Sequence, residues 1–136
     1  MLDLILCVDD DPITLMLCKM VISKSSFATE IITAQNGEEA LNYFDDLKLN
    51  NLGAEIKKYP SLVFLDLNMP VMDGWEFLDH FSKEEYTSAF KNTKIIVLSS
   101  TIDPNDIEKS KTYSMVLDFL SKPITKEIVE NLKERL

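Results

Sequence analysis

Residues 61–74 read SLVFLDLNMPVMDG, an uninterrupted apolar run that ends at an aspartate and continues into a loop with a proline and a glycine. A short apolar run bounded by turn residues is typical of a strand whose two faces are both buried. Asp66 is therefore predicted to lie at the rim of a buried sheet, with a loop directly after it. Open α/β sheets bind their ligands at that position.

Similar apolar runs, rich in β-branched residues, alternate with helical patterns along the chain. The expected strands are residues 2–8, 29–34, 61–65, 94–98 and 117–120, and the expected helices are residues 12–24, 37–51, 74–83, 104–113 and 125–135. Strict alternation of strand and helix predicts right-handed βαβ units and an α/β fold with a parallel sheet.

Polar residues that favour helix starts support this assignment. Asp11 and Asp103 each precede a proline, which is suited to the first helical turn. Asp73 is followed three residues later by Glu76, the spacing of a capping box. Thr125 is positioned to cap the last helix.

Two connections are longer than usual, residues 52–60 and 84–93, and each is expected to carry extra helical turns. The 136 residues fit one domain of ordinary size. We therefore expect residues 1–136 to form a single domain, with no output domain after the fifth helix.

Composition limits the classes of partner. The net charge is -9, which disfavours nonspecific binding to nucleic acid or anionic lipid, because such binding depends on Lys and Arg. No apolar run approaches the roughly 20 residues that span a bilayer, and the N-terminus reads as a strand rather than as a signal peptide. Cys7 and Cys18 do not form a CxxC pair and are expected in the core, in a reducing compartment, so we expect a cytoplasmic protein with no membrane partner.

The ends of four expected strands carry groups suited to phosphoryl chemistry. Asp9 and Asp10 end the first strand, Asp66 the third, Ser99 the fourth and Lys122 the fifth. These positions converge at one edge of a parallel sheet. Clustered carboxylates need a cation, and their hard oxygens favour Mg²⁺. A carboxylate can also act as a nucleophile and form an aspartyl phosphate, whose charge the metal, the ammonium and the hydroxyl would stabilise.

Four motifs in this order resemble the receiver domain of two-component response regulators, such as the chemotaxis regulators. They are VDDDP at 8–12, FLDLNMPVMDG at 64–74, VLSS at 97–100 and FLSKP at 119–123. The resemblance covers essentially the whole chain. It implies a flavodoxin-like (βα)5 fold, a doubly wound parallel sheet with strand order 2-1-3-4-5.

The resemblance also implies a metal site. Asp66 matches the phosphoacceptor, and Asp10 matches the direct Mg²⁺ ligand. Asp9 matches its partner in the acidic pair, which often acts through water. Asn68 matches the residue whose backbone carbonyl completes the metal shell. Mg²⁺ is thus the cofactor that the family likeness implies, with Asp9, Asp10, Asp66 and Asn68 around it.

The likeness assigns further roles to the phosphoryl-binding and switch residues. Lys122 matches the lysine that contacts a phosphoryl oxygen, and it precedes a proline that follows a cis peptide in many relatives. Ser99 matches the hydroxyl residue that moves toward the phosphate. Phe119 matches the aromatic switch that turns inward behind it. The segment SKTYSMVLD at 110–118 departs from the family pattern, because relatives usually carry small residues and glycine there.

The expected function is that of a stand-alone receiver, which is not a turnover enzyme for an external substrate. A histidine kinase or histidine phosphotransfer protein would supply the phosphoryl group, and an unknown downstream protein would receive the signal. One alternative is an interaction module with this fold that works without phosphorylation. Another is a phosphohydrolase with an aspartate nucleophile. Enzymes of the haloacid-dehalogenase type, however, carry a second acidic residue two positions after the nucleophile, where this chain has Asn68.

Each of these residues also has an ordinary structural interpretation when it is taken alone. Asp9 and Asp10 could cap a helix, Asp66 could be a turn residue, and Phe119 could simply pack in the core. The helix at 12–24 is apolar nearly all round, and core burial explains only one face. Its remaining apolar residues could dock a helix of a partner protein.

Overall fold

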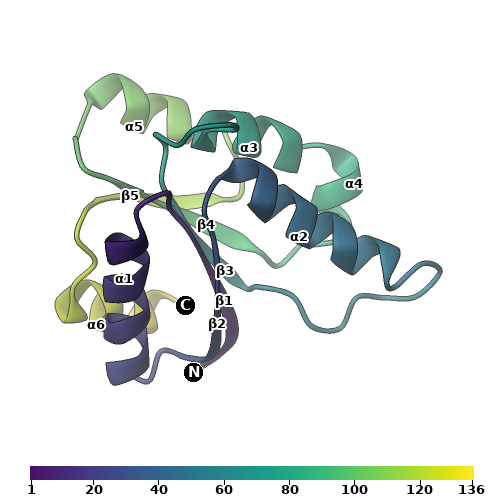
Figure 1. The fold of residues 1–136 in the computed structure, drawn as a ribbon, viewed down its shortest axis with the longest axis horizontal. Helices are drawn as coiled ribbons and strands as arrows, with labels where there is room; N and C mark the ends of the chain where they lie inside the picture. The colour runs from purple at the N-terminus through teal and green to yellow at the C-terminus, as the bar shows by residue number, and fades with distance from the viewer.

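A central sheet of five parallel strands organises the computed structural model, which describes all residues from 1 to 136 (Figure 1). The strands are β1 (Leu2–Val8), β2 (Ala28–Ala34), β3 (Leu62–Leu65), β4 (Lys94–Ser99) and β5 (Val116–Ser121). They pair in the order β2-β1-β3-β4-β5, and every neighbouring pair is parallel. The predicted flavodoxin-like topology is confirmed.

Helices cover both faces of this sheet (Figure 1). On one face lie α1 (Pro12–Lys24) and α6 (Lys126–Arg135), and on the other lie α2 (Gly37–Leu49), α3 (Gly74–Phe81) and the short α4 (Glu84–Thr87). The helix α5 (Pro104–Ser110) lies beside α3 and contacts β5. No helix is both long and apolar enough to cross a membrane.

Three helices end earlier than the sequence pattern predicts. The expected ends were residues 51, 83 and 113, whereas α2, α3 and α5 end at Leu49, Phe81 and Ser110. Just after each end, a backbone N–H bonds a carbonyl three residues back instead of four, as Thr112 does with Lys109. This tightening closes the last turn, so helical periodicity in the side chains continues after the helix has stopped.

The two long connections differ in structure. Residues 84–93 contain the helix α4, as predicted. The expectation of a helical turn within 52–60 was wrong, because residues 55–60 have no regular secondary structure. Gly53 adopts a φ of 75°, the left-handed conformation that commonly ends a helix, and Pro60 restricts the other end.

Two hydrophobic cores lie on either side of the sheet, because successive strand residues point to opposite faces. In β1, Ile5 and Cys7 belong to the core under α1 and α6, whereas Leu6 and Val8 belong to the core under α2 and α3. Residues on both faces of β3 are fully buried, which explains its uninterrupted apolar sequence.

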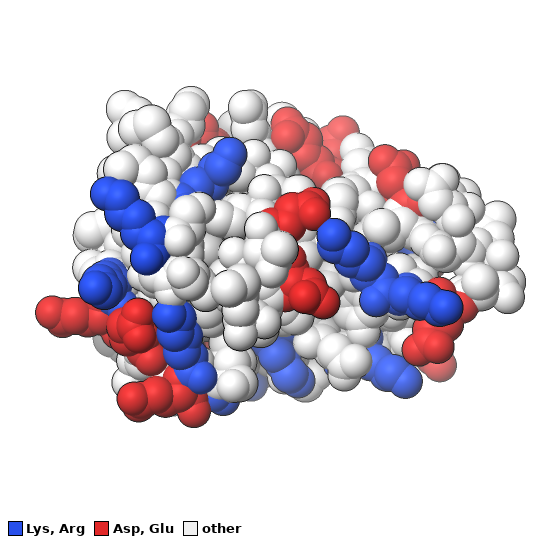
Figure 2. All heavy atoms as spheres, turned by 90° about the horizontal axis from the view of Figure 1, so that it is seen from below, with Lys and Arg blue, Asp and Glu red and all other residues white.

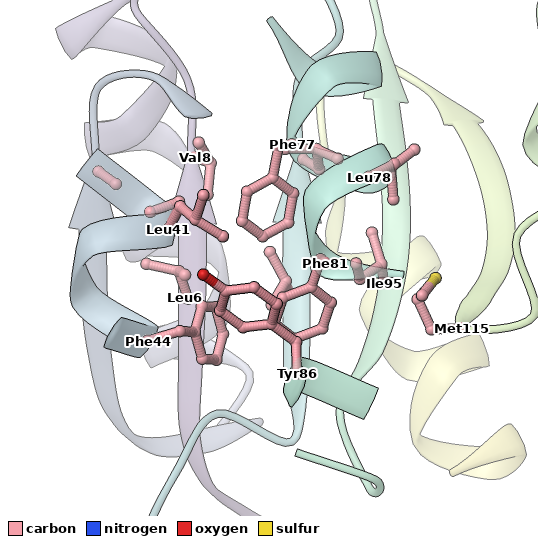
Figure 3. Packing of buried hydrophobic residues seen from close by; sticks show 14 of the residues in the cluster. Leu6, Val8, Leu41, Phe44, Phe77, Leu78, Phe81, Tyr86, Ile95 and Met115 are labelled. Carbon is pink, nitrogen blue, oxygen red and sulfur yellow. The ribbon is translucent and has the colours of Figure 1, made fainter. Parts of the chain in front are cut away.

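An aromatic cluster fills the larger core and anchors α4 (Figure 3). The Phe44 ring centroid lies 4.7 Å from that of Phe81 and 4.8 Å from that of Phe90. The Tyr86 hydroxyl donates a hydrogen bond of 2.6 Å to the Asp45 carboxylate, which ties α4 to α2. Such aromatic pairs contribute about 0.5–1.5 kcal/mol each beyond the burial of their area.

Candidate functional site

The carboxyl ends of four strands bring the predicted site residues to one edge of the sheet. Asp9, Asp66 and Lys122 directly follow β1, β3 and β5, and Ser99 is the last residue of β4. Strand-like hydrogen bonding continues past the strand ends. The Asp66 N–H donates to the Val8 carbonyl at 3.0 Å, and the Lys122 N–H donates to the Ser99 carbonyl at 2.8 Å. The sheet backbone therefore fixes where these residues lie relative to one another.

Lys122 joins two of the acids directly. Its ammonium lies 2.6 Å from Oδ2 of Asp9 and 3.2 Å from Oδ1 of Asp66. One carboxylate oxygen from each of Asp9, Asp10 and Asp66 lies within 4.8 Å of the others. The structure thus brings the three predicted acids and the predicted lysine into one cluster, which we call the acidic pocket.

The three acids differ in their exposure. Asp9 and Asp66 are 5% and 6% exposed, whereas Asp10 is exposed to solvent and forms no ion pair. The second oxygen of Asp9 accepts the N–H of Asp11 at 3.0 Å. Asn68 lies exposed in the loop after β3. The carboxylate that faces solvent is therefore Asp10, while Asp9 is held inside by Lys122.

Burial and charge perturb the ionisation of two site residues. Burial raises the pKa of Asp66, the Asp9 charge raises it further, and Lys122 and the Asn68 backbone only partly offset this. For Lys122, burial lowers the pKa, but the hydrogen bond to Asp9 and the charge of Asp66 outweigh burial and leave the pKa raised. The lysine therefore stays charged, while the acids carry more negative charge than one ammonium can neutralise.

Mg²⁺ fits this donor set. The ion prefers carboxylate and carbonyl oxygens and usually binds through one or two carboxylates while it keeps several waters. Asp9, Asp10 and Asp66 supply three such groups at the required proximity, and one of them faces solvent. A divalent cation would compensate the negative charge that Lys122 leaves uncompensated.

Close packing explains the MDG sequence after Asp66. A Cβ atom on Gly74 would lie 2.5 Å from the Asp66 carbonyl oxygen and 2.9 Å from the Leu67 Cα, so only glycine fits at the start of α3. Asp73 caps the helix and forms the predicted capping box with Glu76. The glycine thus lets α3 begin directly against the strand end that carries the acid.

Strain is visible at Val71 in the same loop. Its φ is 69°, in the left-handed region that a β-branched residue rarely adopts. Val71 is 73% exposed, so its packing contacts do not offset the conformational strain.

Ser99 and Phe119 occupy neighbouring strands. Ser99 is buried, and its hydroxyl accepts the Thr101 N–H at 3.3 Å. Phe119 lies opposite Val97 in the β4–β5 pair and is half-buried, outside both hydrophobic cores. Simple core packing therefore does not account for Phe119.

A surface stack that joins α3 to the end of α5 and the turn after it was not predicted. The Trp75 and Tyr113 rings stack at 6.1 Å, the Lys109 ammonium lies 4.4 Å from the Trp75 ring centroid, and the Tyr113 hydroxyl donates to Asp79 at 2.6 Å. Burial and this hydrogen bond raise the pKa of Tyr113 to about 12. The only sequence feature that could have pointed to this stack is the large Tyr113, in the 110–118 segment where similar receiver domains usually carry small residues.

A doubly wound parallel sheet with clustered acids and a bridging lysine at its carboxyl edge defines the class of this domain, an α/β protein with its polar site at the strand ends. The model of the response regulator receiver domain family matches residues 5–133 of the chain. The chain belongs to this family, which functions in two-component signal transduction.

Individual relatives agree with this assignment. The chain is 29% identical over 135 residues to the probable methanogenesis regulatory protein FilR2 of Methanothrix harundinacea, covering 96% of this chain and 81% of that protein. It is 29% identical over 123 residues to the probable C4-dicarboxylate response regulator DctR of Halalkalibacterium halodurans, covering 90% of this chain but 46% of that protein. The chain thus spans less than half of the second relative.

Solved structures share the fold. A two-component response regulator from Cytophaga hutchinsonii superimposes with a TM-score of 0.85 at 30% identity, covering 98% of this chain and 96% of that one. The chemotaxis protein CheY4 of Vibrio cholerae superimposes with a TM-score of 0.75 at 24% identity, covering 99% and 98% of the two chains.

Proposed function

We propose that this receiver accepts a phosphoryl group on Asp66, with Mg²⁺ bound, from a histidine kinase or a histidine phosphotransfer protein. The observation that carries the proposal is the bridging position of Lys122, 2.6 Å from Asp9 and 3.2 Å from Asp66, with the exposed Asp10 beside them. Cys7 and Cys18 are free thiols, which fits a reducing compartment such as the cytoplasm.

In the proposed reaction, a carboxylate oxygen of Asp66 attacks phosphorus as the bond from phosphorus to the donor imidazole nitrogen breaks. Burial of Asp66 at the end of a rigid strand limits the directions from which a donor can approach. Lys122 already touches the Asp66 carboxylate and is positioned to contact an oxygen of the transferred group. Its raised pKa keeps the ammonium charged as negative charge accumulates.

Asp9, Asp10 and Asp66, with the backbone carbonyl of Asn68, are the residues that would hold Mg²⁺. When bound, the ion would neutralise charge on the acids and on the phosphoryl oxygens. Asp10 is suited to direct contact because it is exposed and unpaired, whereas the Asp9 carboxylate is already occupied by Lys122.

Signalling would follow from a local rearrangement. We assign Ser99 to contact the phosphoryl group and Phe119 to move as Ser99 moves. Both residues belong to adjacent strands, and the half-buried Phe119 ring is not locked into either core. The readout surface would be formed by α5, β5 and α6, the elements around Phe119.

The phosphodonor protein is proposed to contact α1. Four large apolar residues of this helix are exposed: Ile13, Met16, Leu17 and Met20, at 63%, 53%, 43% and 44%. The opposite face of α1 is buried through Leu15, Cys18 and Ile22, so the exposed residues are additional to core packing. Because α1 begins three residues after Asp9, a helix docked along it would lie close to the acidic pocket.

Labelling with acetyl phosphate and Mg²⁺ tests the proposal. The wild type should gain one phosphoryl group, measured by intact mass, and Asp66→Asn should gain none. Asp3→Asn is the matched control, because Asp3 lies in the same sheet but at the opposite, exposed end of β1, and it should label normally. Labelling that persists in Asp66→Asn would reassign the acceptor, and turnover of small phosphate esters would favour a phosphohydrolase.

A further inference from the structure

A second candidate site lies at the end of the sheet opposite the acidic pocket. The connection before β3 and the connection before β4 face each other across a cleft of about 610 Å³, lined by residues from 51–59 and 88–92 together with Lys48. We call this the loop cleft. Its volume is within the usual range for ligand sites, about 300–1,000 Å³.

One wall of the loop cleft has free backbone groups. Residues 55–59 make no backbone hydrogen bonds, and no side chain bonds to their N–H or C=O groups. The segment is nevertheless held at its end, because the Tyr59 ring packs edge-on against Phe90 at 5.3 Å and the Thr93 hydroxyl donates to the Pro60 carbonyl at 2.6 Å. An anchored segment with unpaired peptide groups can pair with an extended chain of a partner.

The charged residues that line the loop cleft are Lys48, Glu55 and Lys91, and further lysines adjoin it at 57, 58 and 94. Residues 48–60 and 88–94 contain five lysines and one glutamate in a chain whose net charge is -9. Lys48 and Lys58 pair with acids, but Lys57, Lys91 and Lys94 form no ion pair. Seen from below, lysine and arginine side chains are interspersed with acidic ones and do not form one continuous basic patch (Figure 2). The groups that would attract an acidic segment are therefore the lysines without an ion pair, Lys91 in the lining and Lys57 and Lys94 beside it.

The loop cleft also offers apolar contacts. Leu52 is 78% exposed, and Ile56 is partly buried against the larger core. Both line the cleft together with Ala54 and Ala89. A peptide with an apolar side chain between two acids could thus place the apolar group against these residues and the acids near the lysines.

We propose that the loop cleft binds an extended, acidic peptide segment of a partner protein, with an apolar side chain seated against Leu52 and Ile56. The segment would pair with the backbone of 55–59, and its acids would approach Lys91 in the lining and Lys57 beside the cleft. This interaction goes beyond phosphoryl acceptance, because the cleft lies at the amino ends of the strands and the acidic pocket at their carboxyl ends.

The test uses a fluorescein-labelled peptide of about eight residues, enough to span five paired residues with ends to spare. Glutamates flank a central leucine in this probe, and a matched peptide carries lysines in their place. The acidic peptide should bind with a saturable change in anisotropy, and the basic one should not. In a ¹⁵N spectrum of the whole chain, the shifted amides should fall within 51–59 and 88–92.

Charge reversal supplies the decisive comparison. Lys57→Glu combined with Lys91→Glu should weaken peptide binding by about tenfold or more. Lys24→Glu combined with Lys126→Glu makes the same charge change at exposed positions outside the cleft, and affinity should stay within about twofold of wild type. Leu52→Ser should also weaken binding without a loss of stability, because the side chain is exposed.

Several results would overturn the proposal. They are equal binding of the acidic and basic peptides, equal loss in the two charge-reversed proteins, shifted amides elsewhere, or no binding up to about a millimolar. Tighter binding of a single-stranded oligonucleotide than of the acidic peptide would also overturn it. Asp66→Asn should bind the peptide as the wild type does, so this test is independent of phosphorylation.

Discussion

Replacing Asp66 by asparagine should stabilise the metal-free protein, although it removes an ion pair. The substitution preserves the shape of the side chain and deletes one of three clustered carboxylates. Lys122 attracts Asp66 at 3.2 Å, while Asp9 and Asp10 repel it from within 4.8 Å. Burial also disfavours the charged form of Asp66. The outcome depends on which of these contributions is larger.

The distances allow an estimate. At an effective dielectric constant of about 20, attraction at 3.2 Å is worth about 5 kcal/mol, and repulsion at 4.8 Å about 3.5 kcal/mol for each acid. Two repulsive pairs therefore exceed the attraction by about 2 kcal/mol. Solvent screens the exposed Asp10, whereas burial adds to the penalty, so we expect a gain of about 1–2 kcal/mol. In a domain of this size, that gain raises Tm by roughly 3–8 °C.

The pH dependence of stability should have the same sign, because it arises from the same burial and the same neighbouring charges. Because the pKa of Asp66 is raised in the folded state, the proton contributes stability below the ordinary aspartate pKa. That contribution is lost as pH rises through the raised, folded-state pKa. The advantage of Asp66→Asn should therefore be large at neutral pH and disappear in acid, where the wild-type carboxyl is protonated.

Urea unfolding in EDTA, at neutral and acidic pH, measures these differences, with Asp3→Asn as the control. Added Mg²⁺ should stabilise the wild type and narrow the gap, since a ligand that binds the folded state raises its stability. If Asp66→Asn were less stable than the wild type at neutral pH without metal, Lys122 would neutralise the pocket by itself. The inference of a cation site from excess negative charge would then fail.

Further substitutions have predicted effects in the loop after β3, at the Trp75–Tyr113 stack and at the metal ligands. Val71→Asn should raise the free energy of unfolding by about 1 kcal/mol, because asparagine tolerates a φ of 69° better than valine, and an unchanged urea midpoint would argue against strain there. Tyr113→Phe should lower the free energy of unfolding by about 1 kcal/mol, because it removes the hydrogen bond to Asp79. A double-mutant cycle should show coupling between Tyr113 and Asp79. Asp10→Ala should weaken Mg²⁺ binding about tenfold or more by calorimetry, whereas Lys122→Ala should leave it largely intact, and equal effects would place the ion elsewhere.

The residue pattern alone was enough to predict the α/β class and the edge of the sheet at which the site lies, whereas the strand order came from the family resemblance. Alternating strands and helices require parallel strands, and parallel strands place all their carboxyl ends together. Asp9, Asp66, Ser99 and Lys122 each follow or end an apolar run, so their convergence was predictable. The start of α1 was also predictable from local sequence, because the Asp11 side chain caps this helix as expected.

The division of contacts among these residues became visible only in the folded chain. Asp9 and Asp10 are adjacent and chemically identical, but consecutive side chains at a strand end point in different directions. Which of them turns inward depends on the register of β1 against its neighbours, and that register buries Asp9 against Lys122 and leaves Asp10 in solvent. The Trp75–Tyr113 stack and the loop cleft likewise join segments that are far apart in the chain. Their contacts therefore cannot be predicted from local sequence.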